Sequence, residues 1–287
     1  GTVQALRLLL SERPRAILLT GGWVGLPVAL AGWLLRIPAL IFLPDIEPGL
    51  AIKVLRRFAQ RVAITAPDSA AYFPAGQTVF TGYPLRQEVT AATRAAGSAH
   101  FQLDPARKTL LVFGGSRGAR SINQAVLAIA PTLLARPDIQ IVHVTGTLDW
   151  EQIEPQCRAL AASGHYHAYA YLHHEMGMAF AAADLVVSRA GASILGEFPY
   201  FGLPSVLVPY PHAWRYQKVN ADYLAERGAA LVMKDADMMG ELLGTINALL
   251  DDPARLETMR QRARALAVPD GARRAAEALM QLAQGEG

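Results

Sequence analysis

Residues 185–197, LVVSRAGASILGE, contain the clearest structural signal in the sequence. The apolar start of this stretch predicts a buried parallel strand, and the small residues after it predict a tight turn into a helix. Small side chains let a ligand reach the backbone, and free N–H groups at a helix start attract phosphate. Glu197, about one helical turn into the helix, can accept hydrogen bonds from sugar hydroxyls. The alternative is an ordinary strand-to-helix corner.

A second strand, glycine loop and helix occur at residues 109–134. The strand 109–113 leads into Gly114-Gly115-Ser116-Arg117-Gly118-Ala119, and a helix is predicted over 121–134. The glycines allow a phosphate to approach the backbone, and the Ser116 hydroxyl can donate to it. The loop matches neither the dinucleotide pattern G-x-G-x-x-G nor a P-loop. A purely structural turn is the alternative here too.

Short apolar strands alternate with helices along the chain. Strands are predicted at 16–20, 39–43, 62–65, 78–80, 109–113, 139–144, 185–187 and 205–208, and helices at 27–35, 50–60 and 253–284. This alternation is typical of α/β proteins with parallel sheets covered on both faces. Gly21-Gly22 and Gly114-Gly115 each follow a strand near the start of a half. We therefore expect two Rossmann-like domains with a cleft between them.

The linker between these domains is predicted at Ala91–His100, which is small, polar and without clear periodicity. This prediction places an N-terminal domain at residues 1–98 and a C-terminal domain at 99–271.

Composition restricts the class of protein further. The 287 residues are 52% hydrophobic and 18% charged, so the chain can bury a large core and is not disordered. The net charge of +3 is compatible with an anionic ligand or membrane surface. The single cysteine, Cys157, excludes a disulfide framework and indicates a reducing compartment. His173, His174 and Glu175 lack a spaced third ligand, so we expect no metal.

Two apolar stretches raise the question of a membrane. Residues 16–43 are nearly all apolar, but glycines, prolines and Arg36 interrupt them, which favours strand, helix and strand over a transmembrane helix. The helix predicted from Leu50 presents a face with Lys53, Arg56, Arg57 and Arg61 among Ile52, Val54, Leu55 and Phe58. The apolar turn Trp33-Leu34-Leu35-Arg36 is expected nearby. Such a face can lie on an anionic bilayer, or it is simply solvated. Nucleic acid is not expected, because aromatic residues do not interleave with a long basic stripe.

Together these motifs resemble the MurG family of peptidoglycan N-acetylglucosaminyltransferases, from about Val3 to the C-terminal helix. Residues 82–86, GYPLR, resemble the family's G-N-P-V-R, and residues 114–119 with Asn123 resemble its G-G-S-Q-G-A and the asparagine after it. Residues 183–197 resemble A-D-x-V-x-R-x-G-A-x-T-x-x-E, and residues 217–221 resemble Q-x-x-N-A. The resemblance implies an α/β GT-B fold, with helix 272–287 returning to the N-terminal domain.

The resemblance also implies an activity. It is the inverting transfer of N-acetylglucosamine from UDP-N-acetylglucosamine to an undecaprenyl-linked N-acetylmuramoyl-pentapeptide, lipid I to lipid II, in peptidoglycan synthesis. The implied location is peripheral, on an anionic membrane surface at the cytoplasmic face of the plasma membrane, among other cell-wall synthesis proteins. No cofactor is implied, and no D-x-D-like motif calls for a metal.

Residue roles follow from the same resemblance. Glu197 would bind the ribose hydroxyls, Ser116 and Arg189 the diphosphate, and Gln217 the N-acetylglucosamine. Arg86 would close the nucleotide site from the other domain, and the backbone at Leu172 and His173 would read uracil, in a loop one residue longer than the family's. The backbone around the sugar would come from the turn formed by Ala192, Ser193, Ile194, Leu195 and Gly196.

Two departures from the family pattern affect these expectations. Asp45 stands where the family has an asparagine, and a carboxylate cannot donate an amide hydrogen bond to a sugar. The family also opens with G-G-T-G-G-H, whose histidine is a candidate general base, and this sequence has no equivalent motif. We therefore expect an incomplete N-terminal domain, a catalytic base outside this sequence and donor binding by the C-terminal half.

Three alternatives stay open at this point. Two are other GT-B enzymes, a diacylglycerol glycosyltransferase or a UDP-N-acetylglucosamine 2-epimerase, although the epimerase needs cleft carboxylates and a histidine that the sequence does not clearly place. The third is a non-catalytic nucleotide-sugar-binding protein in cell-wall assembly.

Overall fold

The computed structural model describes residues 1–115, 118–212 and 215–285, which form two compact units. The first unit combines Gly1–Leu85 with the segment from Val268 onward, and the second is Arg86–Ala267. The sequence places the division near residue 98, whereas the units separate between Leu85 and Arg86. The difference arises because α4 (Gln87–Thr90) and α5 (Arg94–His100) both contact α8 (Met176–Ala182) of the second unit.

The predicted linker at residues 91–100 is wrong for most of its length. Residues 94–100 form α5, whose N-cap Thr93 accepts a hydrogen bond at its side chain from the Ala96 N–H. A Cβ on Gly97 would lie 2.3 Å from the Met178 carbonyl oxygen of α8, so only glycine permits this helix contact. The small residues therefore serve close packing.

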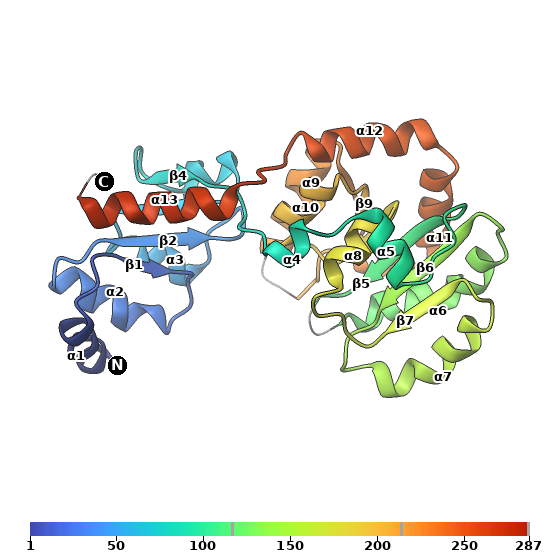
Figure 1. The fold of residues 1–287 in the computed structure, drawn as a ribbon, viewed down its shortest axis with the longest axis horizontal. Coiled ribbons are helices and arrows are strands. Elements are labelled where there is room, and N and C mark those ends of the chain that lie inside the picture. The colour runs from blue at the N-terminus through green and yellow to red at the C-terminus, as the bar shows by residue number, and fades with distance from the viewer. Residues whose placement is uncertain (116–117, 213–214, 286–287) are drawn as a thin grey trace. The chain divides into compact units, whose positions relative to one another are not determined.

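The first unit is a parallel sheet in the order β1-β2-β3-β4, covered on both faces (Figure 1). Helices α1, α2 and α3 contribute to the core on one face, and α13 packs on Leu40 and Ala63 of the other. The bounds are β1 Ile17–Leu19, β2 Ala39–Leu43, β3 Arg61–Ile64, β4 Thr78–Phe80, α1 Thr2–Glu12, α2 Gly25–Leu34, α3 Leu50–Leu55, the 3-10 helix Pro67–Tyr72, and α13 Gly271–Gln284.

The second unit is a six-stranded parallel sheet in the order β10-β9-β8-β5-β6-β7. Its strands are β5 Lys108–Phe113, β6 Ile139–Val144, β7 Tyr166–Tyr169, β8 Leu185–Ser188, β9 Ser205–Leu207 and β10 Ala230–Val232. The helices, besides α4, α5 and α8, are α6 Arg120–Leu134, α7 Trp150–Ala161, α9 Ile194–Phe201, α10 Tyr216–Glu226, the 3-10 helix η2 Asp235–Asp237, α11 Met238–Leu250 and α12 Pro253–Arg264.

This strand order contains a reversal that positions the site. From β5 the chain proceeds outward through β6 and β7, then returns to place β8 on the other side of β5. In doubly wound sheets, ligands bind outside the carboxyl ends of the strands at such a reversal. The glycine loop at residues 114–119 follows β5, and the small-residue turn at residues 189–193 follows β8, so both lie at this point. They are called the two glycine loops below.

The apolar strands β5 and β8 are confirmed as buried. Leu110, Leu111, Val186 and Val187 are all 0% exposed, as expected for strands with helices on both faces. Residues 16–43 form β1, α2 and β2, so the strand, helix and strand interpretation is also confirmed. Within the described residues, no helix combines the length and the apolar character needed to cross a membrane.

Candidate functional site

The two glycine loops leave neighbouring strands side by side. The register of β5 and β8 pairs Phe113 with Ser188, the last residue of each strand. Gly115 and Gly118 both have positive φ, 91° and 81°, which side chains rarely adopt. A Cβ on Gly118 would lie only 2.4 Å from the Thr145 carbonyl oxygen, so this glycine is also required by close packing. Ser116, the predicted phosphate donor, lies outside the described residues.

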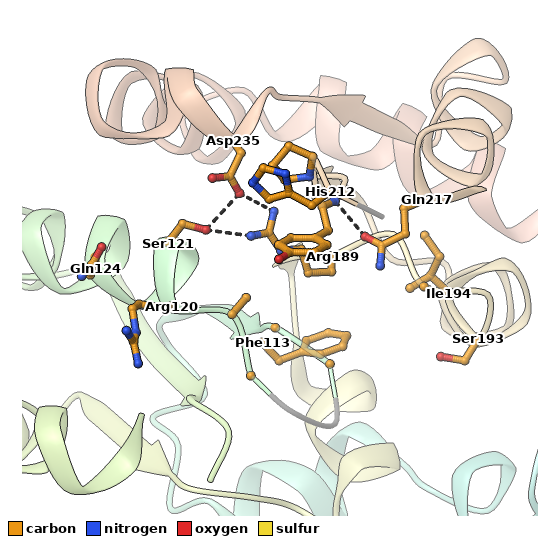
Figure 2. A pocket seen from close by; sticks show the side chains of 17 residues that line it. Phe113, Arg120, Ser121, Gln124, Arg189, Ser193, Ile194, His212, Gln217 and Asp235 are labelled. Carbon is orange, nitrogen blue, oxygen red and sulfur yellow. Dashed lines mark hydrogen bonds and ion pairs between the residues drawn. The ribbon is translucent and has the colours of Figure 1, made fainter. Parts of the chain in front are cut away.

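Two adjoining cavities open around these loops. The larger, of about 950 Å³, is lined by both loops, by the start of α6 and by Gln217 of α10 (Figure 2). The smaller, of about 220 Å³, shares Phe113, Gly115 and Ser193 with it. All residues that line both cavities belong to the second unit.

Glu197 lies in the first turn of α9 and faces the smaller cavity. Burial raises the pKa of its carboxyl, while a hydrogen bond with Ser193 and the charge of Arg86 act in the opposite direction. A half-buried carboxylate at the wall of a cavity can accept two hydrogen bonds from a vicinal diol. A ribose in the smaller cavity could therefore reach the Glu197 carboxylate, as predicted from the sequence.

Arg86 lines the same smaller cavity as Glu197. It precedes α4 and belongs to the second unit. It therefore reaches the cavity from within the unit that holds Glu197, and not from the other domain as the sequence led us to expect.

Leu172 and His173 also line the smaller cavity, in the loop after β7. The His173 N–H donates to Glu175 Oε2 at 2.9 Å, so this carboxylate holds the turn of the loop. Among the described residues, no three His, Cys, Asp or Glu side chains gather as metal ligands.

Arg189 is held by internal partners at the base of the larger cavity (Figure 2). Its side chain is 8% exposed, and it forms an ion pair with Asp235. It also donates to Ser121 Oγ at 2.7 Å and to the Val208 carbonyl oxygen at 3.0 Å. Ser121 in turn donates to Asp235 at 2.9 Å. The guanidinium therefore ties α6 to the loops after β9 and β10, and its charge is matched by a carboxylate.

Gln217 presents one defined end to the larger cavity. Its Oε1 accepts from the Tyr210 N–H at 2.9 Å, which fixes the orientation of the amide. The Nε2 hydrogens are thus the groups that it can offer a sugar hydroxyl.

Some of the remaining predicted residues line a cavity, and others are buried next to it or lie in the first unit. Ser193 and Ile194 line the larger cavity, whereas Leu195 is 6% exposed and packs in the interior. Ala192 and Gly196 belong to the same turn into α9. Asp45 follows β2 in the first unit, so its sugar contact stays a prediction.

Sequence reasoning missed Asp235 and Ser121. Asp235 follows β10 and Ser121 lies in the first turn of α6, so both stand at carboxyl ends of strands or just after them, where ligands bind in such sheets. Their position after strand ends could have identified them as candidate site residues. Their contacts with Arg189 could not be predicted from the sequence, because the three residues are far apart in the chain.

The predicted basic and apolar face of the first unit is narrower than expected. Helix α3 ends at Leu55, and both Ile52 and Leu55 point into the core. Lys53 pairs with Glu47 at 3.6 Å. What stays exposed, and is called the apolar-basic surface below, consists of Trp33, Leu34, Arg36, Leu50, Lys53 and Arg57.

Comparison with known proteins agrees with this geometry. Residues 109–275 match the glycosyltransferase family 28 C-terminal domain. A UDP-N-acetylglucosamine–N-acetylmuramyl-(pentapeptide) pyrophosphoryl-undecaprenol N-acetylglucosamine transferase of Roseiflexus sp. (strain RS-1) is 43% identical, over 96% of this chain and 71% of that protein.

Solved structures give the fold. The crystal structure of Acinetobacter baumannii MurG matches with a TM-score of 0.77 and 27% identity, over 98% of this chain and 78% of that one. A UDP-GlcNAc 2-epimerase from Neisseria meningitidis, bound to UDP-GlcNAc, matches with a TM-score of 0.72 over 98% of this chain and 81% of that one, but at 13% identity it shares the fold alone. The predicted α/β GT-B fold is confirmed, and the chain belongs to glycosyltransferase family 28, among the MurG N-acetylglucosaminyltransferases.

Proposed function

We propose that this protein transfers N-acetylglucosamine from UDP-N-acetylglucosamine to a lipid-linked N-acetylmuramoyl-pentapeptide, lipid I to lipid II, in peptidoglycan synthesis. The observation that carries the proposal is the pair of adjoining cavities at the strand reversal, one with Glu197 in its wall and the other with Gln217. Membership of the family supplies the identity of donor and acceptor.

The donor takes its place by chemical type. The smaller cavity receives the uridine, whose ribose hydroxyls donate to the Glu197 carboxylate while the backbone at Leu172 and His173 reads the base. The larger cavity receives the sugar, to which Gln217 donates from Nε2. The diphosphate then lies against the glycine loops, where N–H groups and the start of α9 favour negative charge.

The transfer itself is a single displacement. The 4-hydroxyl of the acceptor sugar attacks C1 of N-acetylglucosamine as the bond from C1 to the UDP oxygen breaks, so the configuration at C1 inverts. A base takes the hydroxyl proton, and UDP departs with the bonding electron pair. In this proposal, N–H groups at the starts of α6 and α9 stabilise the charge that develops on the diphosphate.

The acceptor carries an undecaprenyl chain, so we propose that the protein works peripherally on the cytoplasmic face of the plasma membrane. The apolar-basic surface supports this, since Trp33 and Leu34 are more than half exposed, at 52% and 54%. Aromatic and apolar side chains beside cations are suited to an anionic bilayer surface. Other cell-wall synthesis proteins are expected at the same membrane.

The proposed donor binding is tested by measuring the affinity for nucleotides by calorimetry. We expect the protein to bind UDP-N-acetylglucosamine and UDP, and not GDP. Glu197→Ala should lower the affinity roughly tenfold or more, because it removes a charged acceptor of two hydrogen bonds. Glu197→Gln, which keeps the shape and one acceptor oxygen, is the matched control and should lose less. Unchanged binding in Glu197→Ala would sink the donor assignment.

The proposed reaction is tested by identifying its products. With UDP-N-acetylglucosamine and a lipid-linked N-acetylmuramoyl-peptide, we expect UDP and the disaccharide product in equal amounts. Formation of UDP-N-acetylmannosamine without acceptor would instead identify an epimerase, and transfer to diacylglycerol would identify a glycolipid synthase.

A further inference from the structure

A line of buried polar side chains crosses the second unit between α7 and α6. Cys157 Sγ lies 3.7 Å from the Tyr166 hydroxyl, which lies 2.7 Å from His143 Nδ1. On the other side of the ring, His143 Nε2 lies 3.1 Å from Asn123 Oδ1. All four residues are at most 2% exposed, so the chain of hydrogen bonds is closed to solvent.

The direction of these hydrogen bonds follows from their far end. Asn123 Nδ2 lies 2.9 Å from the Thr145 carbonyl oxygen and 3.2 Å from Asp149 Oδ2. A carbonyl and a carboxylate only accept, so the amide nitrogen of Asn123 faces them and its oxygen faces His143. His143 must then carry its proton on Nε2 and accept the Tyr166 hydroxyl proton at Nδ1.

The ring of His143 stays neutral in this setting. It is fully buried in β6, and burial lowers its pKa to about 3. A neutral ring has one donor and one acceptor, so a ring that donates from Nε2 to Asn123 accepts at Nδ1 from the Tyr166 hydroxyl. Every member of the chain from Tyr166 to Asp149 therefore has its hydrogen bond.

The chain ends on Thr145 and Asp149, each of which contacts a residue that lines the larger cavity. The Thr145 carbonyl oxygen is the atom against which Gly118 packs, with positive φ and no room for a Cβ. Asp149 accepts from Arg120 Nε at 2.9 Å, the first residue of α6. Gly118 and Arg120 both line the larger cavity. Through Thr145 and Asp149, Asn123 therefore fixes the positions of Gly118, which precedes α6, and of Arg120, the first residue of α6.

We propose that His143, Asn123 and Asp149 are positioning residues for the donor diphosphate, with neutral His143 acting as a fixed hydrogen-bond donor. The Gly118 N–H donates to the Gly115 carbonyl oxygen at 3.0 Å, so the chain acts on a phosphate through the start of α6: it sets where the N–H groups of the first helical turn point. The inference rests on the proposed function for the identity of the ligand, but the hydrogen-bond chain itself does not depend on it.

The first test reads the chain directly in the wild-type protein. NMR of 15N-labelled histidine distinguishes the two neutral tautomers, and the His143 signal is identified as the one lost in His143→Gln. We expect a single Nε2–H tautomer that does not titrate between about pH 5 and 8. An Nδ1–H tautomer, or a ring that titrates in that range, would overturn the proposed chain.

The second test separates positioning from mere stability. Asn123→Asp replaces the donor amide with an acceptor facing Thr145 and Asp149, and we expect the affinity for UDP to fall roughly tenfold. Adding Asp149→Asn restores a donor between positions 123 and 149 and should recover part of that loss. Tyr166→Phe is the matched control, because it removes a buried hydroxyl at the far end and leaves the arm from His143 to Asp149 intact.

The outcomes are distinct. A drop in UDP affinity in Asn123→Asp with partial recovery in the double variant, at thermal stabilities no lower than that of Tyr166→Phe, supports positioning. Equal UDP affinity in Asn123→Asp and Tyr166→Phe would overturn it. If the wild-type protein binds no UDP while the NMR result holds, it is the proposed function that fails, and the donor role with it, whereas the chain stands.

Discussion

The two units share parallel strands and glycine loops, yet they use them differently. In the second unit the strand order reverses at β5 and β8, and two cavities with polar side chains in their walls open there. In the first unit the order β1-β2-β3-β4 has no reversal among the described strands. Its glycine loop at Gly21-Gly22 is followed instead by Trp23 and Val24, which are 55% and 89% exposed. Among the described residues, these two cavities therefore accompany glycine loops at a strand reversal, and the loop at Gly21-Gly22 stands at no such reversal.

The largest effect is expected from substitution of Arg189, which lies among polar partners at the strand reversal of the second unit. Arg189→Ala leaves Asp235 and Ser121 without their shared partner, and we expect a loss of about 2–4 kcal/mol in the free energy of unfolding, measured by urea denaturation. Asp235 is 23% exposed on its side chain, which keeps the expected loss below that of a fully buried pair. The double variant Arg189→Ala, Asp235→Ala should lose less than the sum of the single variants.

The same pair also tests the diphosphate role that the family resemblance implies. If Arg189 serves only to tie the loops together, Asp235→Asn leaves the UDP affinity unchanged. A clear gain in UDP affinity in Asp235→Asn would show instead that the guanidinium, once released from its carboxylate, binds the diphosphate.

Gly118 tests whether the close backbone packing of the glycine loop after β5 matters for stability and binding. Gly118→Ala places a Cβ 2.4 Å from the Thr145 carbonyl oxygen at a positive φ, so we expect a loss of about 2–3 kcal/mol in unfolding free energy together with weaker UDP binding. Gly164→Ala is the control, since its φ of 75° is also positive but no atom lies within 4 Å of the added Cβ. It should lose only about 1 kcal/mol, from backbone strain. Equal losses in the two variants would mean that the contact with Thr145 is unimportant.

The raised pKa of Glu197 predicts a pH effect on donor binding. The carboxylate form accepts the ribose hydroxyls, so UDP affinity should fall as the pH drops through the raised pKa, and Glu197→Gln should flatten that dependence. For stability the sign is opposite, because the folded protein holds this proton more tightly than the unfolded chain. The stabilisation from protonated Glu197 is complete below the ordinary pKa and is lost as the pH rises through the raised value. Calorimetric titrations of UDP across pH 4 to 7 measure the first effect.

The smallest effect on donor binding is expected in the first unit. Trp33→Ala should leave the affinity for UDP-N-acetylglucosamine unchanged while weakening binding to vesicles that contain anionic lipid. Leu148→Ala removes an apolar side chain of the second unit that is 62% exposed, and it should not change vesicle binding. Equal vesicle binding by wild type and Trp33→Ala would remove the apolar-basic surface from the membrane proposal.

Much of the fold could be predicted from local pattern. Strands 39–43, 78–80 and 139–144 have the predicted bounds, and 39–43 is the continuous apolar run expected of a strand covered on both faces. The helix α5 was missed because alanine, glycine and serine are equally typical of a flexible segment and of a helix that packs closely on a neighbour.

The site was predictable only in part. Glu197, Gln217 and the glycine loops stand in recognisable motifs next to strand ends, and the described ones do line the cavities. The partners of Arg189 could not be predicted, because Ser121 and Asp235 come from distant segments that meet only in the folded sheet. The same holds for the contact of His143 with Tyr166 and Asn123.

The first unit is assembled from both ends of the chain, and this has a consequence for synthesis on the ribosome. Helix α13 covers Leu40 and Ala63, residues made long before it. The chain leaves the first unit after Leu85 and returns at Val268, beside Gly82, where an added Cβ would lie 2.5 Å from the Val268 side chain. All of the second unit is therefore translated while one face of the first sheet stays uncovered. Nascent chains halted before Val268 should expose that face to chaperones, although the second unit, Arg86–Ala267, is already complete.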